Sequence, residues 1–468
     1  MDFFSLEFAG SFVIFFILYW LCQKNIKMQN VLLIAASYLF IALFNIKFLL
    51  ILVVYSLLIY LLANVFAQYK YTSARMTYNL FLFVIIVLFV AFKYYSFLQE
   101  SVQQGFERFG LHVDLPVLEL LTPLGMSFYI FHSVSYVVSV QKKEIKPAPL
   151  ADLLLYLCFF PSIVAGPINR AKDLLPQIQA SGRALLQPSR AIALIAFALA
   201  KLFLFSAFLS EHYVNPVFDS PANFSAAQVL LAIYAYAWQI YFNFSGYTNL
   251  VTGLALLLGF AVPQNFNSPY LAENLRLFWR RWHISLSLFI RDYIYIPLGG
   301  NKRGVIRKNI NMFIAMVISG LWHGAGINFL LWGALHGLGL IGLEIKDRFF
   351  PAREGNPFTR LAARLITFHY VCFAWVFFRS STIDDALLML KQLFSGSWRV
   401  GWSQESALLA LAGLLFLCYP QLVTFKRFLA ETQQRIPWFI YPIPLVLFLM
   451  MVFIFAPSGI PGFIYANF

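Results

Sequence analysis

The sequence predicts an all-α integral membrane protein with about 11 membrane crossings or half-crossings. Of its 468 residues, 61% are hydrophobic and only 12% are charged. A soluble globular domain averages nearer half apolar and a quarter charged. Runs of roughly 20 apolar residues recur from one end of the chain to the other. Hydrophobicity within these runs is continuous rather than alternating, which excludes a transmembrane β-barrel.

The candidate spans are apolar runs separated by polar connections. They lie near residues 8–22, 30–44, 46–66, 77–98, 117–140, 190–210, 226–260, 310–345, 360–378, 404–421 and 438–456. The runs at 226–260 and 310–345 are long, and their polar residues and glycines predict interruptions. The first run lacks a basic flank and a cleavage pattern, so we expect it to stay in the chain. Since no long linker separates the spans, residues 1–468 are predicted to form one transmembrane domain.

Basic residues predict the orientation of the chain. Lysine and arginine lie near residues 24–27, 70–75 and 142–146, at every second connection, whereas acidic residues mark the others. Because cytoplasmic loops are enriched in lysine and arginine, we expect the N-terminus outside. The apolar run at 150–166 then begins and ends on the cytoplasmic side. It is predicted to be re-entrant or interfacial, and Pro161 within it would break a spanning helix.

Composition excludes several classes of function. The net charge is +14, but no soluble basic domain exists that could bind nucleic acid, and the positive-inside rule explains the charge better. The four cysteines show neither CxxC spacing nor cysteine and histidine ligand spacing. No HExxH motif occurs. We therefore predict no disulfide framework, no metal site and no bound cofactor.

Residues 265–308 carry nearly half of the net charge, since eight basic residues minus two acidic ones give +6. The basic residues are Arg276, Arg280, Arg281, Arg291, Lys302, Arg303, Arg307 and Lys308. Trp279, Trp282 and Leu286 alternate with the arginines, a pattern that predicts one helix lying at the cytoplasmic interface. The arginines would either anchor the topology or bind an anion such as a phosphate.

A histidine lies in the middle of the predicted span at 310–345. His323 stands between Gly320 and Gly324, and Trp322 precedes it. An ionisable ring at bilayer depth, in a segment that glycines allow to unwind, indicates a functional site. The alternative is a neutral histidine that bonds across helices.

Two further histidines in the same third of the chain favour a functional site. His336 follows Trp332 by one turn, and His283 lies in the basic stretch. Acyl transfer would use such residues, because a hydroxyl that attacks a thioester needs a general base and imidazole suits that role near neutral pH. A phosphorylated thioester donor would be attracted to the arginines.

Several longer motifs resemble the membrane-bound O-acyltransferase family, and most closely its bacterial alginate O-acetyltransferase branch. They are PLGMSFYIFHSVSY (123–136), AGPINR (165–170), YFNFSGYTN (241–249), FWRRWHISLSLFIRDYIYIPLGG (278–300), GLWHGAGINFLLWGALHG (320–337) and FIYANF (463–468). The resemblance runs from about residue 8 to the end of the chain. It implies a ring of tilted transmembrane helices around a central tunnel, in which a cytoplasmic acyl thioester meets an acceptor on the other face.

The resemblance also implies site residues. His323, in the WHG motif, is the expected catalytic residue, and His283 is expected to be important too. The tunnel or donor-binding residues are expected to be Trp322, Asn328, His336, Arg280, Arg281, Arg291, Trp279, Trp282, Asn243 and Ser245. The branch usually has aspartates where this chain has Asn243 and Asn249. For Asn243 and Ser245 the alternative interpretation is a polar break in a long helix.

The first functional hypothesis is a multi-pass enzyme of the bacterial inner membrane. It would pass an acyl group, acetyl in the first instance, from acetyl-CoA or another thioester to an envelope polysaccharide or its periplasmic partner enzyme, as in alginate or peptidoglycan O-acetylation. D-alanyl transfer to teichoic acid from a carrier protein is the alternative within the enzyme class. A transporter of polysaccharide or small molecules is the rival class, and it is disfavoured because no inverted repeat is found. A structural scaffold would predict that histidine substitutions have no effect.

Overall fold

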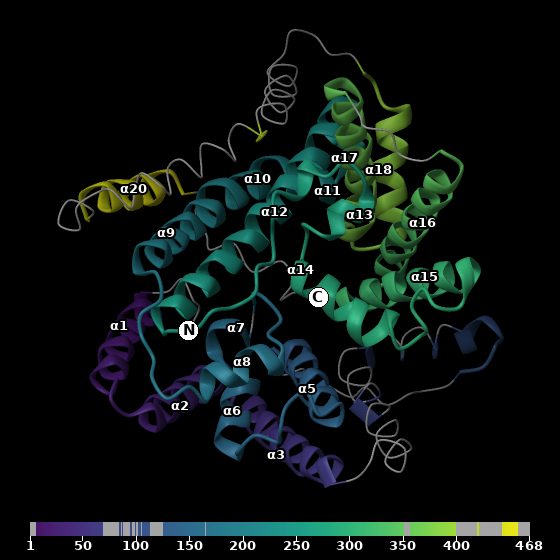
Figure 1. The fold of residues 1–468 in the computed structure, drawn as a ribbon. Coiled ribbons are helices and arrows are strands. Elements are labelled where there is room, and N and C mark those ends of the chain that lie inside the picture. The colour runs from purple at the N-terminus through teal and green to yellow at the C-terminus, as the bar shows by residue number, and fades with distance from the viewer. Residues whose placement is uncertain are drawn as a thin grey trace. The chain divides into compact units, whose positions relative to one another are not determined.

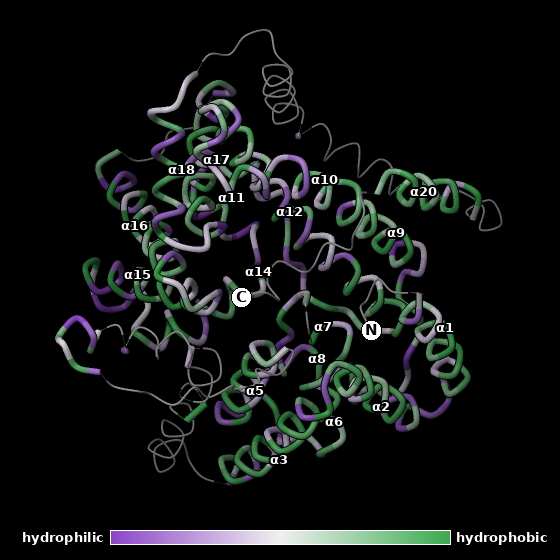
Figure 2. Tube along the Cα trace, turned by 180° about the vertical axis from the view of Figure 1, so that it is seen from behind, coloured by the Kyte–Doolittle hydropathy of each residue, from purple (hydrophilic) through white to green (hydrophobic). Residues whose placement is uncertain are grey.

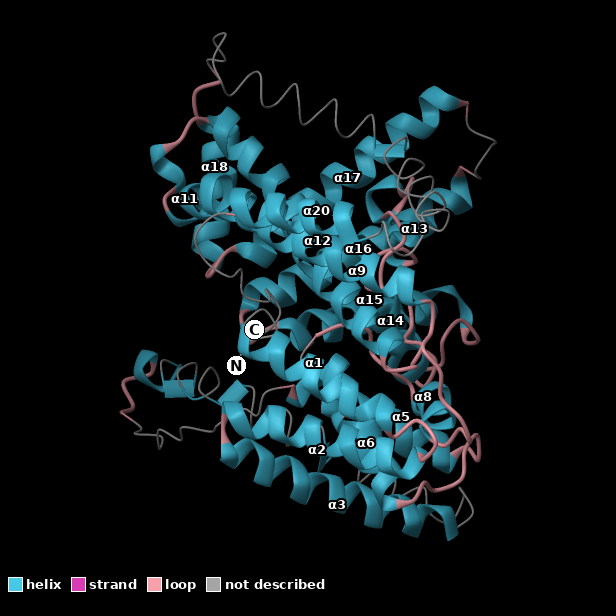
Figure 3. Cartoon of the chain, turned by 90° about the vertical axis from the view of Figure 1, so that its left-hand side faces the viewer, coloured by secondary structure: helices cyan, strands magenta, loops and turns pink. Residues whose placement is uncertain are grey.

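The computed structural model describes residues 6–68, 125–163, 165–350, 356–398, 419–420 and 442–456, with short pieces between residues 84 and 112. Every regular element in these residues is a helix, and Figure 3 contains no strand in the described part of the chain. The predicted all-α class is therefore confirmed. The predicted spans at 77–98 and 404–421 and the FIYANF ending lie mostly or wholly outside the described residues.

The chain divides into two compact units, and the first consists of Met1–Ala191 and Val251–Pro263. Its helices are α1 (Leu6–Leu21), α2 (Ile26–Phe44), α3 (Ile46–Gln68), α5 (Met126–Gln141), α6 (Leu150–Cys158), α7 (Phe160–Ile163) and α8 (Ala171–Ile178). Helix α9 (Pro188–Leu199) begins in this unit, and α12 (Ala226–Leu257) ends in it. Helices α2, α3, α5 and α6 pack on one another (Figure 1).

Arg183 holds distant segments of the first unit together. Its guanidinium donates to the hydroxyl of Tyr19 (2.9 Å) and to Oδ1 of Asn30 (3.0 Å), and it lies 4.3 Å over the ring of Phe260. The Tyr19 hydroxyl in turn donates to the carbonyl of Leu258 (2.8 Å). The planar guanidinium can serve several acceptors and an aromatic face at once, which suits this role.

The apolar run at 150–166 is broken, as predicted. Helix α6 ends at Cys158, and the separate turn α7 contains Pro161, which has no N–H to continue a helix. All four residues of α7 are buried, so the interrupted backbone is enclosed by protein. A re-entrant position in the membrane stays a prediction.

The second unit consists of Ile192–Leu250 and Gln264–Phe468. Besides most of α12, its helices are α10 (Ala207–Leu209), α11 (Asn215–Asp219), α13 (Leu275–Trp279), α14 (Ile284–Ile290), α15 (Gly304–His323), α16 (Ile327–Phe349), α17 (Pro357–Arg379), α18 (Ile383–Ser395) and α20 (Pro442–Phe455). Between α9 and α11 the helix winds into π-type turns at Ala200–Ser206 and Ser210–Val214. Helices α15 and α16 form a closely packed hairpin, and α17 packs on α16 (Figure 1).

Polar side chains determine where several helices begin. Asn25 accepts a hydrogen bond from a backbone N–H in the first turn of α2. Asn356 does the same for α17, which starts with Pro357. Thr382 and Asp385 form a reciprocal capping box at the start of α18. These bonds satisfy N–H groups that have no partner within the helix.

Six helical stretches among the described residues are long and apolar enough to cross a membrane. They are Ile26–Phe44, Ile46–Gln68, Pro188–Asp219, Gly304–His323, Ile327–Phe349 and Pro357–Arg379, and Glu7–Leu21 and Ile443–Phe455 are shorter apolar helices. Apolar side chains on these helices face outward: Val54 is 67% exposed and Ile366 is 71% exposed. Figure 2 shows the hydrophobic character of α2 and α3. The chain is therefore a multi-pass membrane protein, while the count of 11 crossings, the ring and the tunnel stay predictions.

One predicted interruption is present and another is absent. The run at 310–345 breaks between α15 and α16. Helix α12, in contrast, is continuous through 226–257, so the predicted interruption of that run is wrong. Four of its polar residues, Gln239, Asn243, Ser245 and Thr248, are buried within protein rather than exposed at a break. Gly246 allows close packing there, since an added Cβ would lie 2.8 Å from the side chain of Leu202.

Candidate active site

His323 lies where the α15–α16 hairpin turns. It is the last residue of α15, and residues 324–326 are not helical. Glycines permit this tight geometry, because an added Cβ at Gly320 would meet the carbonyl oxygen of Phe329 and one at Gly324 would meet its ring. The predicted unwinding beside His323 is therefore confirmed, and it depends on glycine for packing space.

The imidazole of His323 is enclosed by aromatic rings. Its centroid lies 4.8 Å from that of Trp322, 5.1 Å from that of Trp332 and 5.1 Å from that of Phe378. The residue is only 2% exposed. Dense packing of this kind fixes the orientation of the imidazole and restricts water around it.

His336 packs against a second group of aromatic rings, one turn beyond Trp332 on α16. Its ring centroid is 4.9 Å from Trp332 and 5.0 Å from Trp279 of α13, and Phe278 stacks on it at 6.1 Å. His336 is fully buried, and within the described part of the chain neither ring nitrogen has a hydrogen-bond partner. Such an imidazole can engage a polar group that enters the site.

His283 occupies a turn between α13 and α14. Its backbone is left-handed, with φ 42° and ψ 54°. The ring is 1% exposed, and it lies 4.6 Å from the ring of Phe244 and 6.1 Å from that of Trp322. Burial lowers the pKa of His283 to about 3, so its imidazole is neutral near pH 7.

The basic segment at residues 275–291 is not one helix. The predicted continuous interfacial helix is wrong, because the left-handed turn at His283 separates α13 from α14. The two sides of the segment are as predicted, with Trp282 and Leu286 buried and Arg280 and Arg291 exposed.

Two tryptophans connect the three histidines into one aromatic cluster. Trp322 contacts both His283 and His323, and Trp332 contacts both His323 and His336. The structure thus brings together the three histidines that the sequence singled out. Among the described residues, no group of three or more histidine, cysteine or acidic side chains is placed to hold a metal ion.

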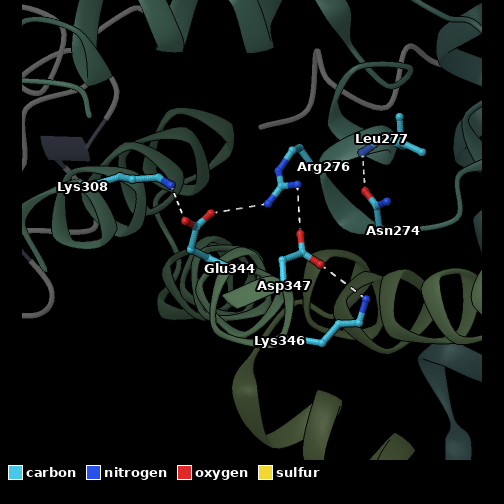
Figure 4. Close-up of polar contacts among 7 residues, drawn as sticks. All are labelled: Asn274, Arg276, Leu277, Lys308, Glu344, Lys346 and Asp347. Atoms are coloured by element: carbon cyan, nitrogen blue, oxygen red, sulfur yellow. Dashed lines mark hydrogen bonds and ion pairs between the residues drawn. The ribbon is translucent and has the colours of Figure 1, made fainter. Parts of the chain in front are cut away.

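Arg276 belongs to an ion-pair cluster (Figure 4). It donates to Asp347 (3.2 Å) and to Glu344 (3.5 Å), while Lys308 pairs with Glu344 (2.5 Å) and Lys346 with Asp347 (3.4 Å). The cluster connects α13 and the start of α15 to the end of α16. Arg276 therefore shares two carboxylates with Lys308 and Lys346, which gives it a structural role that the sequence did not indicate.

The other arginines of the segment differ in their partners. Arg291 pairs with Asp292 at 2.6 Å, and Arg281 makes a long contact of 3.5 Å to the carbonyl of Ser268. Arg280 is exposed, and the part of the chain that the structure describes gives its guanidinium neither a hydrogen bond nor an ion pair. Arg280 is thus the best placed of the three to bind an anion from outside the protein.

Asn328 connects α16 to α17 close to His323. Its side-chain amide donates to the carbonyls of Ser380 (2.7 Å) and Phe377 (3.3 Å), at the end of α17. The amide nitrogen, which the sequence placed in the tunnel or donor site, is used to hold two helices together.

Several aromatic residues that contact the histidines were not singled out from the sequence: Phe244 at His283, Phe378 at His323, and Phe278, Tyr370 and Trp375 at His336. Asn243 and Ser245 are 1% and 2% exposed on α12, on either side of Phe244. Asn243 and Ser245, which the sequence singled out, therefore indicated where Phe244 lies on α12. No comparable signal marked Phe378, which lies in a uniformly apolar run.

Comparisons with known proteins agree with this geometry. A model of the membrane-bound O-acyltransferase family matches residues 33–382. The chain is 33% identical over 431 residues to the probable alginate O-acetylase AlgI of Pseudomonas aeruginosa, covering 88% of this chain and 78% of that protein. It is 35% identical over 310 residues to the peptidoglycan O-acetyltransferase of Helicobacter pylori (58% and 57% covered). It is 28% identical over 280 residues to the teichoic acid D-alanyltransferase of Bacillus subtilis (56% and 70% covered).

Proposed function

This chain belongs to the membrane-bound O-acyltransferase family and is an O-acyltransferase, and we propose that it passes an acetyl group from a cytoplasmic thioester to a hydroxyl of the cell envelope. The acceptor is an envelope polysaccharide or a periplasmic partner enzyme that serves it. The membrane is the bacterial inner membrane, the setting that fits a thioester donor on one side and an envelope acceptor on the other. Relatives named for O-acetylation share 33% and 35% identity with the chain, against 28% for the D-alanyltransferase, which supports acetyl as the group.

The observation that carries the proposal is the position of His323. Its imidazole ends a membrane helix at a non-helical turn, and aromatic rings pack around it. In this setting His323 takes the proton from the acceptor hydroxyl as that oxygen attacks the thioester carbonyl. The carbon–sulfur bond then breaks, and the imidazolium returns the proton to the leaving thiolate. The products are an O-acyl ester and a free thiol, so the histidine is regenerated.

The remaining cluster suggests a path for the donor. Arg280 follows Trp279 in the chain, Trp279 contacts His336, and Trp332 lies between His336 and His323. Arg280, together with Arg281 and Arg291 of the same basic segment, binds the phosphates of an anionic donor such as acetyl-CoA. The thioester then reaches His323 past the aromatic rings, which accept an apolar acyl group.

The other predicted tunnel residues complete this path. Trp282 is a buried residue of the basic segment, and Asn243 and Ser245 lie on α12 on either side of Phe244, whose ring contacts His283. They line the route of the donor or the acceptor. Their polar atoms offer hydrogen bonds to a substrate inside an otherwise apolar site.

D-alanyl transfer to teichoic acid is the second candidate. It is favoured by the likeness to a teichoic acid D-alanyltransferase over 56% of the chain. The chemistry at His323 would be the same, with a carrier-protein thioester as donor.

Reconstituted enzyme tests the proposal. The purified chain in proteoliposomes is given radiolabelled acetyl-CoA and either alginate oligosaccharides or peptidoglycan fragments, and alkali-labile label on the acceptor is measured. Transfer by the wild type that is lost in His323→Ala supports the proposal. Transfer only from a D-alanyl carrier-protein thioester would replace acetyl with D-alanyl. Passage of solute across the vesicle without any ester formation would refute both.

A further inference from the structure

The segment that precedes the basic helices pairs with the turn that holds His283. The backbone N–H of Asn267 donates to the carbonyl of Arg281 (3.0 Å), and the N–H of Ile284 donates to the carbonyl of Asn265 (3.0 Å). These two bonds lie on opposite sides of His283 in the chain. The backbone on both sides of the histidine is therefore fixed to one short segment.

The side chain of Asn265 adds a second pair of bonds. Its Oδ1 accepts from the backbone N–H of Ser285 (3.2 Å) and from the hydroxyl of Ser285 (2.6 Å). Asn265 is fully buried, so these bonds are protected from water. One side chain thus holds the residue two positions after His283 through both its backbone and its side chain.

Helix α14 needs this help because it begins without a cap of its own. His283 stands at the N-cap position, but its side chain makes no capping hydrogen bond. The first N–H groups of a helix have no partner within the helix. Asn265 provides the missing acceptors, its carbonyl for Ile284 and its Oδ1 for Ser285.

His283 also has a backbone conformation that is unfavourable for a residue with a Cβ. Its φ of 42° lies in the left-handed region. Such a conformation persists only where surrounding bonds impose it. On the C-terminal side of His283, Ser287 bonds back to the carbonyls of His283 and Trp282 within the turn, and the described bonds that reach a distant segment are those to Asn265.

We infer that Asn265 is a positioning residue for the acyl transfer, which acts by holding His283 in its left-handed turn against Phe244 and Trp322. This inference rests on the proposed acyl transfer and on a part for His283 in it, which the family resemblance implies. Asn265 itself touches no reacting atom. Loss of its Oδ1 releases the start of α14, and the imidazole of His283 then leaves its place in the aromatic cluster.

A set of matched variants tests the inference. Asn265→Ala removes both bonds from Ser285, whereas Asn265→Asp keeps an acceptor at Oδ1. Within the described residues Nδ2 of Asn265 makes no hydrogen bond, so replacing the amide with a carboxylate removes no hydrogen bond at that atom. Asn267→Ala is the control, because Asn267 lies two positions away and its side chain is exposed. Ser285→Ala removes only the hydroxyl bond.

Two measurements are made on each purified variant, kcat for acyl transfer and hydrogen–deuterium exchange of peptides covering residues 281–288. Asn265→Ala is expected to lower kcat at least about tenfold, since small misplacement of a reacting group is costly. Exchange at the start of α14 should become faster in the same variant. Asn265→Asp should retain a higher kcat and slower exchange than Asn265→Ala. Asn267→Ala should match the wild type in both measurements. Ser285→Ala should show a smaller loss than Asn265→Ala.

Normal kcat in folded Asn265→Ala, or unchanged exchange, overturns the inference. If Asn265→Ala does not fold, Ser285→Ala decides, and wild-type kcat in that variant overturns it. The variant His283→Ala distinguishes failure of the positioning role of Asn265 from failure of the role of His283 in the reaction. Normal kcat in His283→Ala removes His283 from the reaction, whereas impaired His283→Ala with normal Asn265→Ala removes only the positioning role.

Discussion

The indole of Trp332 stands perpendicular to the imidazole of His323, with 5.1 Å between centroids and 89° between ring planes. The edge of one ring thus meets the face of the other, which is a favourable arrangement for two aromatic systems. Trp332 is 1% exposed and also contacts His336, so it supports both histidines at once.

Trp332→Ala should therefore lower stability and turnover together. Removing a buried tryptophan leaves a cavity, and the free energy of unfolding is expected to fall by about 3–5 kcal/mol. Trp332→Phe keeps a ring in place and should retain most of the turnover. Thermal unfolding in detergent and the acyl-transfer assay measure the two effects. Equal turnover in Trp332→Ala and Trp332→Phe would mean that the ring does not support His323.

His323→Ala should abolish acyl transfer in protein that still folds. Loss of a general base typically lowers the rate 10²–10⁴-fold. The control is His212→Ala, which removes an exposed histidine from the same unit. Turnover per folded protein is compared after size-exclusion chromatography. Near-normal turnover in folded His323→Ala would end the catalytic role, and an acyl group recovered covalently on His323 would replace the general base with a relay.

Arg280→Gln should weaken donor binding. A charge-assisted hydrogen bond contributes about 1.5–3 kcal/mol, so the donor KM should rise about 10- to 150-fold while kcat changes less. Arg190→Gln is the matched control, because Arg190 is an exposed arginine of the other unit. Arg276→Gln should act mainly on stability, by less than about 1 kcal/mol, since its ion pairs are partly exposed. Unchanged donor KM in the Arg280, Arg281 and Arg291 variants would leave these three arginines as topology anchors.

The basic loop before α15 should face the cytoplasm, and the loop before α12 should face outward. A cysteine is introduced as Lys302→Cys or as Asn223→Cys, both at exposed positions, in a chain whose four native cysteines are replaced by alanine. Intact cells are treated with an impermeant maleimide. We expect labelling of the Asn223→Cys protein alone, and labelling at position 302 would reverse the predicted topology.

Stability should depend on pH through His283. Burial lowers its pKa from 6.5 to about 3, so between these values the unfolded chain binds a proton that the folded chain does not. The contribution of the neutral ring is fully present above pH 6.5 and is lost as pH falls, by up to about 1.4 kcal/mol per pH unit. His283→Asn removes the pH-dependent contribution of the imidazole to stability, and asparagine tolerates the left-handed backbone at this position. Between about pH 7.5 and about pH 5, the free energy of unfolding should fall more for the wild type than for His283→Asn. Equal falls in the two proteins would contradict the lowered pKa of His283.

Hydrophobic runs predicted the long helices because length and continuous apolarity determine membrane spans. The run at 46–66 became Ile46–Gln68, and the run at 360–378 became Pro357–Arg379. Glycines around His323 correctly predicted the break there. They marked a place where side chains would leave no room for the neighbouring helix.

Features that depend on distant contacts were not predictable. The pairing of Arg276 with Glu344 and Asp347 joins segments far apart in the chain, and no local pattern signals it. The turn at His283 is bonded to Asn265, a residue outside both α13 and α14, whereas hydrophobic periodicity alone indicated one helix. The polar residues of α12 suggested a break, but a polar group buried within protein does not need one.

The glycine contacts of the hairpin also decide what can move near His323. Gly320 and Gly333 bring the backbones of α15 and α16 together, since an added Cβ on either would strike the other helix. Two helices in such contact cannot slide past each other, so the hairpin behaves as one rigid rod. Helix α17 is attached at the His323 end by the amide of Asn328, through two hydrogen bonds that can break and re-form. A further bond holds α17 to α16, from the Tyr370 hydroxyl to the carbonyl of Leu335 (2.6 Å), so room for a substrate beside His323 has to come from side chains rather than from separation of α15 and α16.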